Sequence, residues 1–291
     1  MDSNLQKYRA FVTTVDCGSF TKAAEVLDYA QSSVSKMVAD LEAEWNVNLL
    51  ERSRAGVQLT SDGVAMLPYA RELLDSYRKV QEQAAALSGV TTGLIRIGTF
   101  SSVATHWIPD IIRHFQADYP GIRYELLLGD YSEIEHWIFD GRVDCGFLRL
   151  PSNEEFETIS LERDEYVAVL PKGHTLTEKE LLRYEDLVGQ PFMLLEHGGK
   201  TEVSEMLEKH QIKPDIRFTT WDDYAILSMV ESGLGIGVLP RLILRRIPYQ
   251  VEIRSFSEPF YRDIGLALRS SSSASAAVKK FIQYLKYRNG Q

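Results

Sequence analysis

The chain has 291 residues, of which 44% are hydrophobic and 25% charged, as in a globular protein of about two domains. Its formal net charge of −9 argues against a surface adapted as a whole to nucleic acid, so any DNA-binding function must depend on where its few cations lie. The sequence has no apolar run of 18 residues and no secretory leader in its first 20, so we expect a cytoplasmic protein without a membrane span.

Residues 1–60 are expected to form three helices and a hairpin. Gly18 ends the first amphipathic helix, and Ser19 can cap the second, a short one. The third helix has an apolar stripe with spacings of three and four: Val34, Val38, Leu41 and Trp45. Residues 48–60 then predict two short strands joined by a turn.

The face of the third helix opposite its apolar stripe carries small side chains, among them Ser32, Ala39 and Ala43, with one lysine, Lys36. Such a face is narrow enough to enter the major groove of DNA. There Gln31 can pair with adenine, and Lys36 can reach guanine or a phosphate. Thr21 and Lys22, at the start of the second helix, would then lie across the DNA backbone.

Residues 61–88 predict one long helix, kinked near Pro68. Seven residues form an a/d seam over three heptads, which favours pairing with a second copy of the chain: Met66, Ala70, Leu73, Tyr77, Val80, Ala84 and Leu87. The alternative is a helix packed on its own domain. The stretch 88–93 resembles a hinge.

From Leu94 onward, predicted strands and helices alternate in two similar runs. This pattern indicates an α/β fold with open, parallel-type sheets in two lobes. In such folds, ligands bind where the carboxyl ends of strands meet the amino ends of helices.

Three N-terminal stretches resemble the winged helix-turn-helix of LysR-type transcriptional regulators: "FVTTVDCGSFTKAAEVL" (11–27), "QSSVSKMVADLE" (31–42) and "NLLERSRAGVQLTSDG" (48–63). "GRVDCGFL", "AVLPKGHTL" and "ESGLGIGVLP" are similar to later family stretches. The resemblance implies a sequence-specific regulator that binds promoter DNA as a dimer or tetramer and acts with RNA polymerase. A small polar or anionic effector would bind in its C-terminal domain, which resembles periplasmic binding proteins.

The resemblance also implies domain boundaries. The winged helix-turn-helix would cover residues 1–60, the dimerising linker helix and hinge 61–90, and the effector domain 91–291. Lobe I would comprise about 91–161 and 267–291, and lobe II about 162–266.

The residues that the resemblance assigns to DNA are Gln31, Ser32, Ser33, Ser35 and Lys36 on the reading helix, and Arg52 and Arg54 on the wing. Two positions depart from the family pattern. Ala30 replaces the usual serine before the reading helix, so the helix loses a cap of about 1 kcal/mol unless Gln31 or Ser32 takes over. Leu50 replaces the usual phenylalanine in the wing.

Candidate effector-binding residues follow from the predicted strand-to-helix junctions. Thr99, Ser101 and Ser102 lie at the first junction, which the family uses for its effector, and Ser101 can alternatively be a plain helix cap. Six further candidates lie at later junctions, where a surface salt bridge or a structural role is the alternative: Phe147, Arg149, His197, Lys200, Thr201 and Trp221.

Other chemistries find little support in the sequence. "GLGIGV" (233–238) follows a predicted helix and opens a strand, the reverse of a dinucleotide fingerprint, so we interpret its glycines as turn residues. No catalytic arrangement, cofactor motif or metal-ligand spacing is evident, and Cys17 and Cys145 are too far apart in sequence to suggest a redox switch. The competing hypothesis, a solute-binding module or enzyme with an unrelated helical domain, predicts a signal peptide or catalytic residues, and the sequence shows neither.

Overall fold

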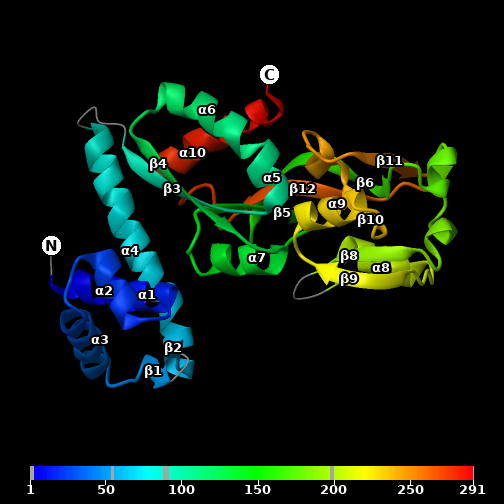
Figure 1. Cartoon of the computed structure of the whole chain (residues 1–291). Helices are drawn as coiled ribbons and strands as arrows, with labels where there is room; N and C mark the ends of the chain where they lie inside the picture. The colour runs from blue at the N-terminus through cyan, green and yellow to red at the C-terminus, as the bar shows by residue number, and fades with distance from the viewer. Residues whose placement is uncertain (1–2, 54–55, 88–91, 197–199, 291) are drawn as a thin grey trace. The chain divides into compact units, whose positions relative to one another are not determined.

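The computed structural model describes residues 3–53, 56–87, 92–196 and 200–290 (Figure 1). The chain divides into two compact units. The N-terminal unit comprises Met1–Gly93 with the short segment Phe139–Val143, and the second unit comprises Leu94–Ile138 and Asp144–Gln291. We call the second unit the effector domain.

The N-terminal unit is a winged helix-turn-helix followed by a long helix. Its elements are α1 (Ser3–Cys17), α2 (Phe20–Leu27), α3 (Gln31–Trp45), β1 (Leu50–Ser53), β2 (Gly56–Leu59) and α4 (Ser61–Leu87). Gly18 ends α1 with a φ of 60°, and Asp28 ends α2 in the left-handed region. Val34, Val38 and Leu41 are buried, which confirms the predicted apolar stripe of the third helix.

The first turns of α4 belong to the core of the N-terminal unit. Ala70 is buried in that core, and Met66 packs against it. These two members of the predicted seam therefore face their own domain within one chain. Leu73, Tyr77, Val80 and Ala84 are exposed, and the side chain of Leu87 lies outside what the structure describes. The exposed apolar row is extended toward the N-terminus by Tyr69, which the sequence analysis missed. The helix runs through Pro68 without a break.

The effector domain is built on one long sheet with the strand order β4-β3-β5-β12-β6-β10-β8-β9. In chain order these strands are β3 (Gly93–Thr99), β4 (Ile122–Leu128), β5 (Cys145–Leu150), β6 (Glu157–Pro171), β8 (Pro191–Leu195), β9 (Asp215–Thr220), β10 (Ile236–Pro240) and β12 (Tyr261–Leu268); β7 (Leu181–Leu182) and β11 (Val251–Phe256) pair beside them. The helices are α5 (Ser101–His106), α6 (Ile108–Asp118), α7 (Tyr131–Phe139), α8 (Glu202–Lys209), α9 (Asp223–Glu231) and α10 (Ala276–Ile282).

The sheet is mixed and not simply parallel. Parallel pairing occurs within each lobe, between β3 and β5 and between β8 and both β9 and β10. The long strands β6 and β12 pair antiparallel with each other and pass through the middle of the sheet. The expected parallel sheets are therefore joined by an antiparallel crossing, because the chain passes twice between the lobes.

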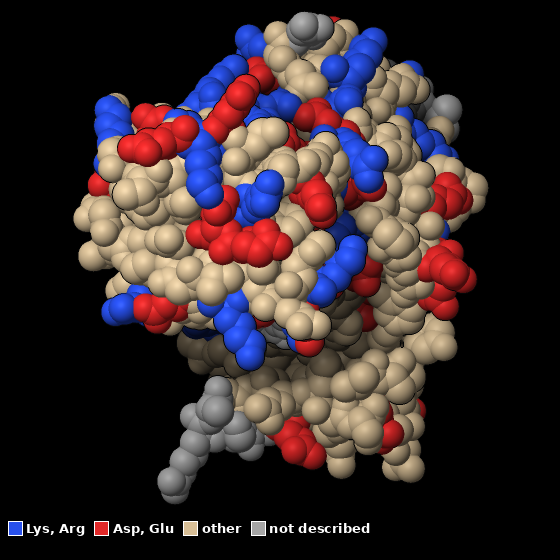
Figure 2. Space-filling view, turned by 90° about the vertical axis from the view of Figure 1, so that its right-hand side faces the viewer, with Lys and Arg blue, Asp and Glu red and all other residues tan. Residues whose placement is uncertain are grey.

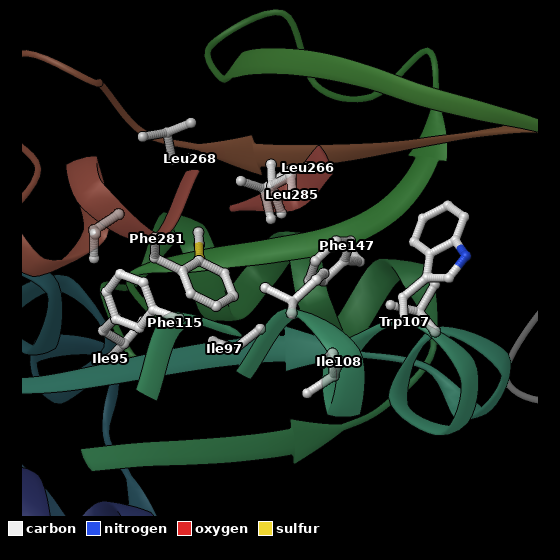
Figure 3. Packing of buried hydrophobic residues seen from close by; sticks show 14 of the residues in the cluster. Ile95, Ile97, Trp107, Ile108, Phe115, Phe147, Leu266, Leu268, Phe281 and Leu285 are labelled. Atoms are coloured by element: carbon white, nitrogen blue, oxygen red, sulfur yellow. The ribbon is translucent and has the colours of Figure 1, made fainter. Parts of the chain in front are cut away.

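Each lobe has its own hydrophobic core. Figure 3 shows the first, in which Ile95 and Ile97 from β3, Phe147 from β5 and Phe115 from α6 pack together. In the second lobe, β6 separates two clusters. Tyr166, Ala168 and Leu170 face one, and the intervening Val167 and Val169 face the other. This alternation is the period of two expected of a strand buried on both sides.

Gly233 and Gly235 lie in the turn before β10, as predicted, whereas Gly237 lies within β10 and pairs with Val169 and Met193. Gly233 follows α9 with a φ of +73°. A Cβ at Gly235 would lie 2.3 Å from the Pro191 carbonyl oxygen, so glycine alone allows this close approach to β8.

Candidate DNA-binding helix and effector cleft

Helix α3 presents the predicted polar face. Gln31, Ser32, Ser33 and Lys36 are exposed and Ser35 is half-buried, whereas the opposite stripe is buried in the core. Trp45 at the far end packs against Tyr8, with ring centroids 5.5 Å apart. The core therefore fixes the orientation of α3 and leaves the small polar side chains at its amino end open to a ligand.

The amino end of α3 has no side-chain cap. Ala30 occupies the N-cap position with an extended backbone, and no side chain accepts a hydrogen bond from the first turn. The Ala30 carbonyl accepts from the Ser33 and Val34 amides, and we find no partner for the Gln31 and Ser32 amides among the described residues. An unfilled helix amino end of this kind suits a phosphate oxygen.

The other predicted DNA contacts lie around this helix or outside the described residues. Thr21 and Lys22 are exposed in the first turn of α2, which Ser19 caps through the Lys22 amide at 3.4 Å. Arg52 lies in β1 opposite Val57, and its side chain is not described. Arg54 falls outside the described residues.

A cleft of about 300 Å³ lies in the effector domain, within the volume range of small-molecule sites. Its walls come from the ends of β4, β5, β8 and β9 and from the first turns of helices α5, α7, α8 and α9. The cleft therefore lies at strand-to-helix junctions, where the sequence predicts that ligands bind.

The structure brings five of the nine candidate effector residues to this cleft: Ser101, Arg149, Lys200, Thr201 and Trp221. Thr99, Ser102 and Phe147 are buried behind its wall. Phe147 lies inside β5, not after it, and its ring packs 6.3 Å from that of Trp107. Ser101 is not the cap of α5, because Phe100 occupies that position. His197 lies outside the described residues.

Arg262, which lines the cleft, belongs to a buried ion pair that the sequence analysis missed. Arg262 from β12 and Asp164 from β6 are 5% and 4% exposed, and Arg262 Nη2 lies 2.8 Å from Asp164 Oδ2. Arg262 also donates to Ser102 Oγ at 2.8 Å and to the Tyr131 hydroxyl at 3.1 Å. The other Asp164 oxygen accepts from the Leu242 amide at 2.9 Å. The pair therefore connects the crossing strands to α5, α7 and the segment after β10.

The other two described cations of the cleft are also paired with carboxylates. Arg149 Nη1 lies 3.3 Å from Glu205 Oε2 and 3.6 Å from Glu202 Oε1. Lys200 Nζ lies 2.6 Å from Glu208 Oε2. Each cation that lines the cleft in the described ranges thus has an acidic partner within the protein.

Two carboxylates of the cleft wall are buried without enough hydrogen-bond donors or positive charge around them to offset the cost of burial. Glu202, at the start of α8, is 8% exposed, and its Oε1 atom has no hydrogen-bond partner among the described residues. Asp223, at the start of α9, is 7% exposed. Burial raises the pKa of Asp223 to about 6, although the positive charge of Arg262 lowers it.

The raised pKa of Asp223 predicts a pH-dependent stability. Between its ordinary pKa and about pH 6 the folded state retains the proton while the unfolded state releases it, so stability falls as pH rises through this window. Asp223→Asn should remove this cost and raise the free energy of unfolding at neutral pH by about 2–3 kcal/mol, with a smaller gain near pH 4. Urea titrations at both pH values, followed by tryptophan fluorescence, measure the difference. An equal gain at the two pH values would contradict the prediction, and exposed Asp215→Asn is the control.

The face of the second lobe that is seen in Figure 2 carries side chains of both signs of charge. Figure 2 shows Lys and Arg side chains interspersed with Asp and Glu over the second lobe. Lys179–Asp186 and Arg217–Asp215 are two such pairs. Among the described residues, no helix is long and apolar enough to cross a membrane, and no group of His, Cys, Asp and Glu is arranged to hold a metal ion.

Comparison with known proteins agrees with the two-part architecture. Residues 5–64 match the family model "Bacterial regulatory helix-turn-helix protein, lysR family", and residues 88–289 match "LysR substrate binding domain". The chain is 32% identical over 285 residues to the HTH-type transcriptional regulator YvbU of Bacillus subtilis, covering 97% of each chain. It is 33% identical over 289 residues to the probable regulator LrrA of Synechococcus elongatus, covering 97% of this chain and 96% of that one.

Solved structures share the fold. A full-length OxyR variant from Pseudomonas aeruginosa has a TM-score of 0.76 at 22% identity, covering 98% of this chain and 97% of the other. CbnR in complex with its target DNA has a TM-score of 0.66 at 20% identity, covering 98% and 99%. A winged helix-turn-helix joined by a long helix to a two-lobed ligand-binding domain defines a class of transcriptional regulators. This chain belongs to the LysR family of that class and is a DNA-binding transcriptional regulator.

Proposed function

We propose that this regulator reads promoter DNA with the exposed face of α3 and responds to a small metabolite bound in the cleft of its effector domain. The observation that carries the DNA part is the small polar face of α3, where Gln31, Ser32, Ser33 and Lys36 are exposed while the opposite stripe is buried. A helix with such a face fits the major groove, and its amino end reaches base edges.

The DNA contacts that we propose are Gln31, Ser32, Ser33, Ser35 and Lys36 in the groove, with Thr21, Lys22, Arg52 and Arg54 on the backbone or minor groove. The exposure of Thr21 and Lys22 beside α3 supports the first two backbone contacts. The chain has few cations in this unit, so we expect a small number of phosphate contacts and a correspondingly shallow salt dependence.

We infer that the chain acts as a homodimer or a tetramer paired through α4, and that it contacts RNA polymerase at the promoter. The exposed apolar row on α4 supports the pairing, because such a row is costly to leave in water. The effector would be polar or anionic, held near Ser101, Arg149, Lys200, Thr201, Trp221 and His197, with Thr99, Ser102 and Phe147 behind them. An effector that binds one arrangement of the lobes more tightly than another would shift the population of DNA-bound states.

A gel-shift assay with the region upstream of the protein's own gene tests the DNA-binding proposal. Lys36→Glu should lower the affinity by about 10-fold or more, because a groove contact worth about 1–3 kcal/mol becomes a repulsion. Ser33→Asp should do the same. Lys213→Glu makes the same charge change at an exposed site of the effector domain and should leave binding nearly unchanged. Equal binding by Lys36→Glu and wild type would overturn the proposed role of α3.

A further inference from the structure

We propose that the effector carries a protonated amine or guanidinium group, and that Glu202 and Asp223 of the cleft wall bind this cation. The inference rests on the proposed function, in which the cleft binds the effector, and adds the chemical class of the ligand. Of the polar or anionic metabolites expected from the sequence, it keeps the polar class, specifies a positively charged group, and replaces the anionic alternative.

The balance of charge in the cleft favours a cation. The described residues that line it include three basic side chains, Arg149, Lys200 and Arg262, against five carboxylates, Asp130, Glu135, Glu196, Glu202 and Asp223. Lys200 is paired with Glu208 and Arg262 with Asp164, neither of which lines the cleft, and Arg149 is shared between Glu205 outside the cleft and Glu202 on its wall. An anionic ligand would have to displace one of these pairs, whereas a cation meets an existing excess of negative charge.

Glu202 has a side-chain hydrogen bond with the Tyr166 hydroxyl, but one of its two carboxylate oxygens lacks a donor within the part of the chain that the structure describes. It is more than nine-tenths buried, and its Oε1 atom has no hydrogen-bond donor among the described residues. The nearest cation, Arg149 Nη1, is 3.6 Å away, beyond hydrogen-bonding distance. A buried carboxylate oxygen without a donor is costly, and a ligand ammonium or guanidinium group would supply the missing hydrogen bond.

Asp223 provides a second acceptor on the cleft wall. It is also more than nine-tenths buried, and its raised pKa reflects burial without a sufficient counter-charge. Glu202 begins α8 and Asp223 begins α9, so two helices each contribute one carboxylate to the same cavity. A bound cation would favour the charged form of both.

An aromatic ring of the cleft wall suits a small organic cation. Trp221 lines the cleft and is 60% exposed, whereas the Phe100 ring already faces the guanidinium group of Arg262 at 5.0 Å. A cation over an aromatic face gains a further attraction. The volume of about 300 Å³ is at the lower end of the range for ligand sites and favours a metabolite of amino-acid size.

Binding of charge-matched probes to the full-length protein tests this inference. We would use butylguanidine with butylurea, butylamine with 1-butanol, and 1,4-diaminobutane with succinate, at millimolar concentration, in thermal-shift and calorimetric titrations. At least one cationic probe should raise the melting temperature, and its partner without the cation should bind about 30-fold more weakly or not at all. Glu202→Gln and Asp223→Asn should each weaken the cationic probe to a similar extent.

Asp215→Asn is the matched control, because Asp215 is a carboxylate that pairs with Arg217 on the surface, and neither residue lines the cleft. It should bind the cationic probe like wild type, and circular dichroism should show that all three variants are folded. The inference is overturned if succinate binds in place of the amines, if no cationic probe binds, or if Glu202→Gln and Asp223→Asn bind the amine as wild type does. Failure of the effector role is separate: a probe that binds in the cleft without altering the DNA complex in a gel shift contradicts the proposed function alone.

Discussion

Asp164→Asn is expected to lower the free energy of unfolding of the effector domain by about 3–5 kcal/mol, because it leaves Arg262 charged and buried without its counter-ion. Arg262 donates two hydrogen bonds to Asp164 Oδ2, at 2.8 and 3.0 Å, and both side chains are almost fully enclosed. Urea unfolding followed by tryptophan fluorescence measures the loss, since three of the four tryptophans, Trp107, Trp137 and Trp221, lie in this domain.

A surface pair provides the control for this prediction. Asp215 and Arg217 lie 2.6 Å apart but are 44% and 58% exposed, so Asp215→Asn should change stability by less than about 1 kcal/mol. The double variant Asp164→Leu with Arg262→Met should regain much of the loss, because it removes both buried charges. If Asp164→Asn is no more destabilising than Asp215→Asn, the pair does not hold the crossing strands together.

Leu73→Asp is expected to convert the protein from an oligomer to a lower-order species whose mass is half that of wild type. Leu73 is 43% exposed in the single chain and lies between Tyr69 and Tyr77 in the apolar row of α4. Two aspartates facing each other in a paired seam would be buried without partners, a cost of several kcal/mol that a two-helix contact does not offset. Multi-angle light scattering gives the mass directly.

The change at Leu73 must be distinguished from a general effect on the helix. Glu72→Lys alters charge at the neighbouring exposed position outside the row and should leave the mass unchanged. Circular dichroism should show equal helix content in both variants. A Leu73→Asp protein with the mass of wild type would show that α4 is not the pairing surface.

The N-terminal unit was predictable from sequence because its signals are local. Spacings of three and four identify the buried stripe of α3, and Gly18 marks a helix end that needs a positive φ. What the apolar face of α4 contacts was harder to predict. Periodicity shows that Met66 and Ala70 share a face with the later seam residues, but it does not tell whether that face meets its own domain or another chain.

The cleft was harder to predict because its residues come together only through tertiary pairing. Asp164 and Arg262 are 98 positions apart, and their contact depends on the register between β6 and β12. Phe147 and Arg149 lie on one strand, yet the first is fully buried and the second reaches the cleft, because the core ends between them. No local pattern indicates where along a strand the core ends. Glu202 and Asp223 could have been noticed as acidic residues at the starts of predicted helices. Acidic residues are common there because they stabilise the amino end of the helix, so this position alone does not indicate a ligand site.

The missing cap at Ala30 has a measurable kinetic consequence. Because the Gln31 and Ser32 amides lack internal acceptors among the described residues, their hydrogens should exchange with deuterated solvent nearly as fast as in an unstructured peptide. A phosphate oxygen at this position would slow that exchange only while a duplex is bound. Isotope labelling of these two positions would thus report promoter occupancy residue by residue.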